Sequence, residues 1–413
     1  MTWHKDASGA RPTRHAGGYA VCLLIVFVDM VGFGIIIPFL PFWAEKFGAG
    51  PAIVALVMTI YSGCSFISSF PLGWLSDRWG RKPVLLLSIG GSAIGFAILA
   101  VAQSLWLVFV ARAVGGLFGG NIAVAQAYVA DTTDEAGRAK GMGLMGAAMG
   151  LGFVFGPALG GLLAGSDPAN PNFRLTFWVA FGISMLSVLL GLVLLHEPER
   201  HKDVGPDLSP LDRAKVLVEI IRVPGVAVPI LVGFVVIFAM AGLEATFALW
   251  TNRTHGWGPQ ANGYFFACIG VVLVVVQGGM VGPVSRHIGD RRMLVLGITV
   301  LMIGMVLVPA SLTLPVLIAS GAAVAIGMGF ASPAMTTLAS RNAPANKQGA
   351  IMGAAQSMQS LARVVGPIVA GLLFEGISRD APYFVGAAVL LFALVLIFAL
   401  YKRLAAPGTE RTP

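Results

Sequence analysis

Twelve apolar runs, each about as long as a lipid bilayer is thick, constrain the fold of this chain more than any other feature. A helix needs about 20 apolar residues to cross the hydrocarbon core of a bilayer. Lipid admits only helices or closed barrels, and these runs are too long and too uniformly apolar for barrel strands. We therefore expect an all-α membrane protein with twelve transmembrane helices. The runs cover residues 19–42, 52–75, 84–104, 106–130, 140–165, 174–196, 226–250, 260–283, 293–311, 314–338, 348–374 and 382–402.

Composition excludes several other classes of protein. Hydrophobic residues make up 57% of the 413-residue chain and charged residues 11%, too few charges to cover a soluble domain or to keep a chain disordered. The three cysteines lie inside apolar runs with no metal-binding spacing. A GxGxxG stretch at 141–146 opens a membrane span instead of following a strand, so it does not indicate a dinucleotide. We expect no metal, no cofactor and no enzymatic activity.

The net charge of +8 is interpreted as a topology signal and not as a nucleic-acid surface. Basic residues concentrate in the cytoplasmic loops of membrane proteins. With the N-terminus inside, 21 of the 27 Lys and Arg residues fall on the cytoplasmic side and four fall outside. We expect a multi-pass protein of the cell membrane, specifically a bacterial inner membrane, with both termini in the cytoplasm. Its expected partner is the lipid bilayer and not nucleic acid.

The chain also divides into two similar halves. Its longest polar stretch, residues 196–222, follows the sixth span, and residues 73–83 are echoed at 282–292, 209 residues later. Gly156 and Pro157 recur as Gly366 and Pro367 at an offset of 210. Such duplication implies two pseudo-symmetric six-helix bundles with a site where they meet. The expected domains are a cytoplasmic tail (1–18), a bundle (19–196), a cytoplasmic linker (197–225), a second bundle (226–402) and a tail (403–413).

The loop after span two carries the most specific motif. It reads G-W-L-S-D-R-W-G-R-K-P and resembles the loop pattern of the major facilitator superfamily at all eleven positions. The resemblance implies an intracellular gate, closed when the transporter opens outward, in which Asp77 and Arg81 join Asp131 at the inner end of span four. The alternative is a loop whose charges only satisfy the positive-inside rule, but that alternative does not require Asp77. The gate residues are Gly73, Asp77, Arg78, Gly80, Arg81 and Asp131.

Span five carries G-F-V-F-G-P-A-L-G-G, which fits a pattern that the superfamily uses chiefly in antiporters and exporters. Glycines on one helix face permit tight contact, and Pro157 removes a backbone donor and bends the span. The resemblance implies a helix about which the halves pivot; ordinary helix packing is the alternative. The residues concerned are Gly152, Gly156, Pro157, Gly160 and Gly161.

Spans one and four indicate which branch of the superfamily the chain resembles. Span one, from Asp29 to Pro41, and the Arg112–Gly116 stretch of span four resemble the twelve-span drug:proton antiporter branch, and residues 129–133 are similar to bacterial tetracycline exporters. Those exporters also carry an acid in span three, a His in span eight and an acid in span nine. None of these is present here, which argues against tetracycline itself and against metal-chelate recognition.

Four ionisable residues fall within the spans: Asp29, Arg112, Glu244 and Arg363. Together they cost on the order of 10 kcal/mol in lipid, so they are expected to face a wet cavity or each other. In the superfamily, spans one, four, seven and ten line the central cavity. We expect protonation of Asp29 and Glu244 to be coupled to substrate binding. The alternatives are a permanent Asp29–Arg112 ion pair and an Arg363 that only orders its own span. Further cavity candidates, for which core packing is the alternative where they are aromatic or Met, are Phe33, Asn121, Gln126, Phe247, Trp250 and Met335.

The expected function is secondary active transport: a proton-coupled antiporter that exports small amphipathic organic compounds or drugs by alternating access, functional as a monomer. Its partners are then a small-molecule substrate and protons. One alternative is an exporter of a metabolite such as a sugar, an amino acid or a siderophore. A second is a non-transporting membrane receptor, although the largest soluble segment is only the central loop.

Overall fold

The computed structural model describes residues 14–133, 135–167, 170–198, 224–342 and 348–399. Within these ranges every regular element is helical, and twelve helical segments are long and apolar enough to cross a membrane, which confirms the predicted fold class. The expected tails and the linker fall largely on residues 1–13, 199–223 and 400–413, which lie outside the described residues.

The helices follow the two halves of the sequence. Those of the N-terminal half are α1 (Arg14–Ile36), α2 (Leu40–Glu45), α3 (Pro51–Trp79), α4 (Arg81–Val101), α5 (Leu105–Phe118), α6 (Ile122–Thr132), α7 (Glu135–Ala164) and α8 (Phe173–Leu194). Those of the C-terminal half are α10 (Pro224–His255), α11 (Pro259–Val275), η1 (Val276–Met280), α12 (Val281–Ile288), α13 (Asp290–Ala310), α14 (Leu314–Arg341), α15 (Gln348–Gly376) and α16 (Ala381–Ala399).

Two predicted spans are interrupted. Span four breaks into α5 and α6 at Gly119 and Gly120, and span eight contains the single π-helical turn η1 between α11 and α12. A side chain at position 120 would lie 2.9 Å from the backbone of Ser69, so glycine there lets the break pack directly on α3. The π-turn contains Gly278 and Gly279, and paired glycines lower the cost of leaving regular α-helix.

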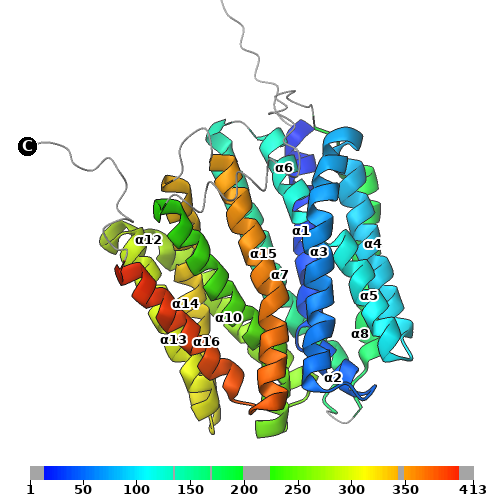
Figure 1. Cartoon of the computed structure of the whole chain (residues 1–413). Helices are drawn as coiled ribbons and strands as arrows, with labels where there is room; N and C mark the ends of the chain where they lie inside the picture. The colour runs from blue at the N-terminus through cyan, green and yellow to red at the C-terminus, as the bar shows by residue number, and fades with distance from the viewer. Residues whose placement is uncertain (1–13, 134, 168–169, 199–223, 343–347, 400–413) are drawn as a thin grey trace, which may run out of the picture.

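Most core residues cluster within one half, although the largest cluster of the C-terminal half also includes Ala44, Ala49 and Val54. The halves meet along two helix pairs. Helix α7 packs against α11, and α3 packs against α15; Figure 1 shows α15 beside α3 in the middle of the molecule. Helix α2 lies at one end of the bundles, here named the α2 end, and Arg81 lies at the opposite end, here named the Arg81 end.

The halves are in contact at the α2 end and separated at the Arg81 end. At the α2 end, Gly161 of α7 lies against Gly263 of α11, and Gly371 of α15 lies against Ala55 of α3. Nearer the Arg81 end, a methyl group added to several glycines of α7, η1 and α15 would meet nothing within 4 Å. These glycines are Gly143, Gly146, Gly278, Gly279 and Gly353. The structure is therefore one conformation of a two-bundle molecule, closed at one end.

Candidate functional site

A small cavity of about 30 Å³ lies between the two halves. Helices α1, α3 and α5 line it from the N-terminal half, and α10 and α15 line it from the C-terminal half. Three of the four predicted intramembrane charges, Arg112, Glu244 and Arg363, are brought together here from different spans, together with the predicted Phe33. The remaining lining residues are Ile37, Met58, Ser62, Ala241, Ala245 and Pro367.

The two charges contributed by the C-terminal half form a loose ion pair. A guanidinium nitrogen of Arg363 lies 3.7 Å from a carboxylate oxygen of Glu244, and their side chains are 40% and 19% exposed. The pair is too long for a hydrogen bond of good geometry. Each partner therefore has remaining capacity to bind a proton, water or a solute in the cavity.

Asp29 lines a second small cavity, of about 20 Å³, inside the N-terminal half. Phe33 and Arg112 line both cavities. The side chain of Asn121 interacts with the Asp29 carboxylate. The ion pair between Asp29 and Arg112, kept open above as an alternative, does not occur among the described residues.

Arg112 instead lies over an aromatic ring. Its guanidinium carbon is 4.2 Å from the ring centroid of Tyr61 on α3, a cation–π arrangement. The Arg112 side chain is buried, and its Nε has no hydrogen-bond partner among the described residues. Tyr61 was missed from the sequence because span two is not among the spans that the resemblance assigns to the cavity. The only feature of the sequence that could have indicated Tyr61 is a phenol within an apolar run.

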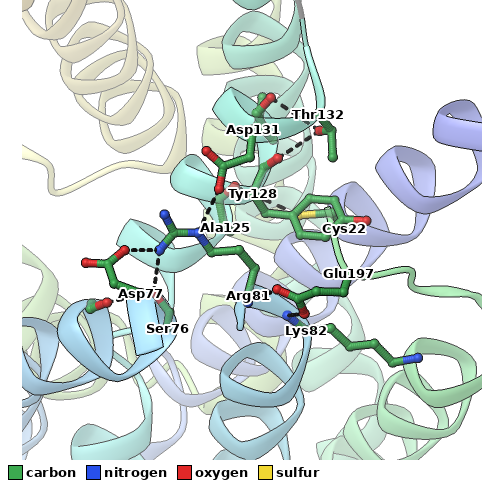
Figure 2. A network of polar contacts seen from close by, with 12 residues as sticks. Cys22, Ser76, Asp77, Arg81, Lys82, Ala125, Tyr128, Asp131, Thr132 and Glu197 are labelled. Atoms are coloured by element: carbon green, nitrogen blue, oxygen red, sulfur yellow. Dashed lines mark hydrogen bonds and ion pairs between the residues drawn. The ribbon is translucent and has the colours of Figure 1, made fainter. Parts of the chain in front are cut away.

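Three of the predicted gate residues, Asp77, Arg81 and Asp131, form a connected network at the Arg81 end, which Figure 2 shows from close by. Arg81 lies between two carboxylates: its Nη1 is 2.6 Å from Asp77 and its Nε is 2.8 Å from Asp131. Nη1 also donates to the Ser76 hydroxyl at 2.7 Å. The network joins the end of α3, the start of α4 and the end of α6, so all its members belong to the N-terminal half.

The carboxylate of Glu197, which was not among the predicted gate residues, binds the start of α4 next to this network. Glu197, after α8, accepts hydrogen bonds from the backbone N–H groups of Arg81 and Lys82 at 2.6 and 2.9 Å. These are first-turn donors of α4 that have no partner within the helix. Gly80, with φ of +114°, makes the turn between α3 and α4 and leaves room for Glu197, whose carboxylate would lie 2.7 Å from a side chain there.

The glycines of span five have two different partners. Gly152, Gly156 and Gly160 pack against α1 of the same half, and Gly161 packs against Gly263 of the other half. Pro157 lies inside the continuous helix α7.

A different kind of contact crosses the halves at the α2 end. Arg253 at the end of α10 lies 3.4 Å from the Glu45 carboxylate of α2. Burial raises the pKa of the Glu45 carboxyl, and the charge of Arg253 acts in the opposite direction.

Comparison with protein families gives a match over nearly the whole chain. The model described as Major Facilitator Superfamily matches residues 22–363 and, overlapping them, residues 277–413. The chain belongs to the major facilitator superfamily. It is therefore a multi-pass membrane transporter and not an enzyme, and the resemblance stated from its motifs is confirmed.

Relatives within the superfamily include drug-resistance proteins. The tetracycline resistance protein of class G from Vibrio anguillarum is 31% identical over 91% of this chain and 96% of its own length. Multidrug resistance protein 2 from Bacillus subtilis is 26% identical over 92% of this chain and 94% of its own length. Among solved structures, a bacterial homologue of the human lysosomal transporter Spinster has a TM-score of 0.73 at 16% identity and covers 96% of this chain and 97% of its own.

The C-terminal half of this superfamily member repeats the gate with its charges reversed. Asp290 stands at the position of Arg81, and Arg341 stands at the position of Asp131. They form an ion pair of 2.6 Å, and the Ser285 hydroxyl donates to Asp290 as the Ser76 hydroxyl accepts from Arg81. The repeat predicted from the loop sequences thus extends to a matching ion pair of opposite polarity.

Three other cavity candidates lie in the C-terminal core. Phe247, Trp250 and Met335 are 1–3% exposed and line neither of the two central cavities. Phe247 stacks on Phe265, and the Trp250 indole donates to Asp380 at 2.7 Å. Gln126 is exposed on α6. These four residues are not brought together with the intramembrane charges.

Proposed function

We propose that this transporter is a proton-coupled antiporter that exports small amphipathic organic compounds, including drugs, by alternating access. The names of its tetracycline-resistance and multidrug-resistance relatives support drug export. The observation that carries the proposal is the cavity between the halves, which holds Glu244, Arg363 and Arg112 and is closed at the α2 end.

The proposed orientation places both termini in the cytoplasm of a bacterial cell, with the protein acting as a monomer in the inner membrane. It rests on the excess of Lys and Arg in the loops of the Arg81 end. In this orientation the α2 end faces outward, and the conformation described here opens toward the cytoplasm. The proposed domains are the bundles at 19–196 and 226–402, joined by a cytoplasmic linker at 197–225 and flanked by cytoplasmic tails.

Glu244 and Asp29 are the proposed proton carriers. A proton on Glu244 removes the negative charge that holds Arg363, and a proton on Asp29 changes its hydrogen bonding with Asn121. A solute with a basic or polar group competes with the proton for the same carboxylate. Exchange requires at least this competition, because binding of the solute then favours release of the proton, and binding of the proton favours release of the solute.

The remaining predicted residues take structural roles in this proposal. The cluster around Asp77, Arg81 and Asp131 is the cytoplasmic gate, together with Gly73, Arg78 and Gly80. Gly161 of α7 and the Pro157 carbonyl form the surface along which the two halves move, and Gly152, Gly156 and Gly160 hold α7 to α1.

The test uses purified protein in proteoliposomes with an imposed pH gradient and a panel of drugs, sugars, amino acids and siderophores. We expect gradient-dependent movement of amphipathic drugs, which Glu244→Gln abolishes. Asp167→Asn, in the exposed loop between α7 and α8, is the matched acid-to-amide control and retains transport. Movement of only one metabolite class, or undiminished transport by Glu244→Gln, contradicts the proposal.

A further inference from the structure

Helices α3 and α15 form an antiparallel pair that crosses the boundary between the halves. Each has 29 residues and is therefore about 43 Å long. Helix α3 begins at the α2 end and finishes at the Arg81 end, and α15 runs the other way. At each end of the molecule the N-terminus of one helix thus lies at the level of the C-terminus of the other.

At the α2 end, the N-terminus of α3 is capped by a residue of the opposite half. Glu375, in the last turn of α15, accepts a hydrogen bond from the backbone N–H of Ala52 at 2.9 Å. The N-cap residue of α3 is Gly50, which has no side chain to make this bond, and the first turn of α3 contains no acid. Glu375 therefore supplies both the acceptor and the negative charge that a helix N-terminus favours.

This cap exists only while the halves touch. Ala52 belongs to the N-terminal half and Glu375 to the C-terminal half, and the approach depends on close packing one turn away. There a side chain on Gly371 of α15 would lie 2.5 Å from Ala55. The Glu45–Arg253 ion pair at 3.4 Å is a second charged contact across the same end. Arg379, whose guanidinium donates to the Arg253 carbonyl, and Asp380 are the other charged groups nearby.

We propose that Glu375 is the latch that closes the α2 end. Glu375 caps α3 when the α2 end is closed, and it loses this partner when the halves separate there. Glu375 is a positioning residue that sets the balance of the two conformations without contacting the transported solute. The exchange between two conformations rests on the proposed alternating access; the cap itself does not.

The test measures conformation directly, without substrate or a pH gradient, so its outcome is independent of which compounds are exported. Spin labels on cysteines at Gln103 and Leu312, exposed at the α2 end of opposite halves, report the distance across that end by pulsed electron resonance. The three native cysteines are replaced by serine in this background.

Glu375→Gln keeps an acceptor oxygen but removes the charge, and Glu375→Ala removes both. We expect each to raise the ratio of open to closed α2 ends by about 2- to 5-fold, the effect of losing one charged cap on an exposed helix terminus.

Asn172→Ala is the matched control. Asn172 caps α8 by accepting from the Leu175 N–H at 3.1 Å, at the same end of the molecule but within one half. Its loss is expected to leave the ratio unchanged. The proposal is overturned if neither Glu375 variant changes the ratio, if Asn172→Ala changes it as much as Glu375→Gln does, or if every variant shows one and the same distance.

Discussion

A single methyl group added to Gly263 is expected to open the α2 end without unfolding either half. The added carbon would lie 2.5 Å from the carbonyl oxygen of Pro157, and 2.7 Å from the Cα of Gly161. Ordinary contact begins near 3.4 Å, so α11 and α7 must separate by about 0.9 Å. Both obstacles are backbone atoms, which cannot rotate away as a side chain does.

The free-energy cost of this separation follows from the overlap. Overpacking of this kind costs about 1–3 kcal/mol, which corresponds to about a 5- to 150-fold change in an equilibrium. Gly263 and Gly161 belong to different halves, so the cost applies only while the α2 end is closed. We expect Gly263→Ala to raise the open-to-closed ratio by an amount in this range.

Gly156→Ala provides a control with nearly identical geometry. Its added carbon would lie 2.6 Å from the Val31 carbonyl oxygen and 2.8 Å from the Cα of Gly34. These atoms belong to α1 of the same half, so the strain is present in both conformations. The gain in helix propensity from Gly to Ala, about 1 kcal/mol, is common to both variants. Gly156→Ala is expected to lower the thermal unfolding temperature and leave the conformational ratio unchanged.

Distance distributions between labels at Gln103 and Leu312 report the ratio, and thermal unfolding in detergent reports stability. The reasoning is refuted if Gly263→Ala leaves the ratio within about twofold of wild type. It is equally refuted if Gly156→Ala shifts the ratio as far as Gly263→Ala does, because the contact would then not distinguish the two conformations.

Three shorter predictions concern charges and topology. Asp29→Asn is expected to abolish proton-driven export while membrane insertion, followed by fluorescence of a fused reporter, stays normal; export at the wild-type rate would remove Asp29 from proton coupling. Reversing the C-terminal pair, with Asp290→Arg and Arg341→Asp together, is expected to recover part of the thermal stability that Asp290→Arg alone loses, whereas additive losses would mean that the pair contributes nothing. A cysteine at Gln103 is expected to react with a membrane-impermeant maleimide in intact cells and a cysteine at Arg286 only after lysis; the opposite pattern would invert the proposed topology.

The sequence predicted the parts of the fold that depend on bulk properties. The number of spans follows from the length of apolar runs, and the duplication follows from spacing, so both are present in the structure. The pairing of Arg81 with Asp77 was predicted from a motif whose residues lie within four positions of each other. The pairing with Asp131, 50 residues away, was predicted only through the resemblance to the superfamily. Apart from that pair, the determining information is local or periodic.

The cavity was predicted only in part, because a membrane helix can be apolar on every face. Lipid and the protein core favour the same side chains, so the amphipathic pattern that orients a helix in a soluble protein is weak here. Phe247 and Trp250 were accordingly assigned to the cavity although they are core residues, and Tyr61 was overlooked although it lies against Arg112. The positions of the intramembrane charges could be predicted without knowing the helix orientation, because a charge is excluded from lipid on every face of a helix.

The glycines of α7 lie on two faces of the helix, so one motif holds α7 within its own bundle and also forms its contact with the other half. Gly156 and its neighbours along the helix fix α7 to α1, so Asp29 and Phe33 on α1 move with α7 as one body. Gly161 presents a flat backbone to Gly263 of the other half, with no side chain to interlock. Contacts of backbone on backbone have little torsional preference, so they separate and re-form at low cost. Both contacts are equally close in this conformation, but only the contact with α1 lies within one bundle, so only the contact with α11 is lost when the bundles rock apart.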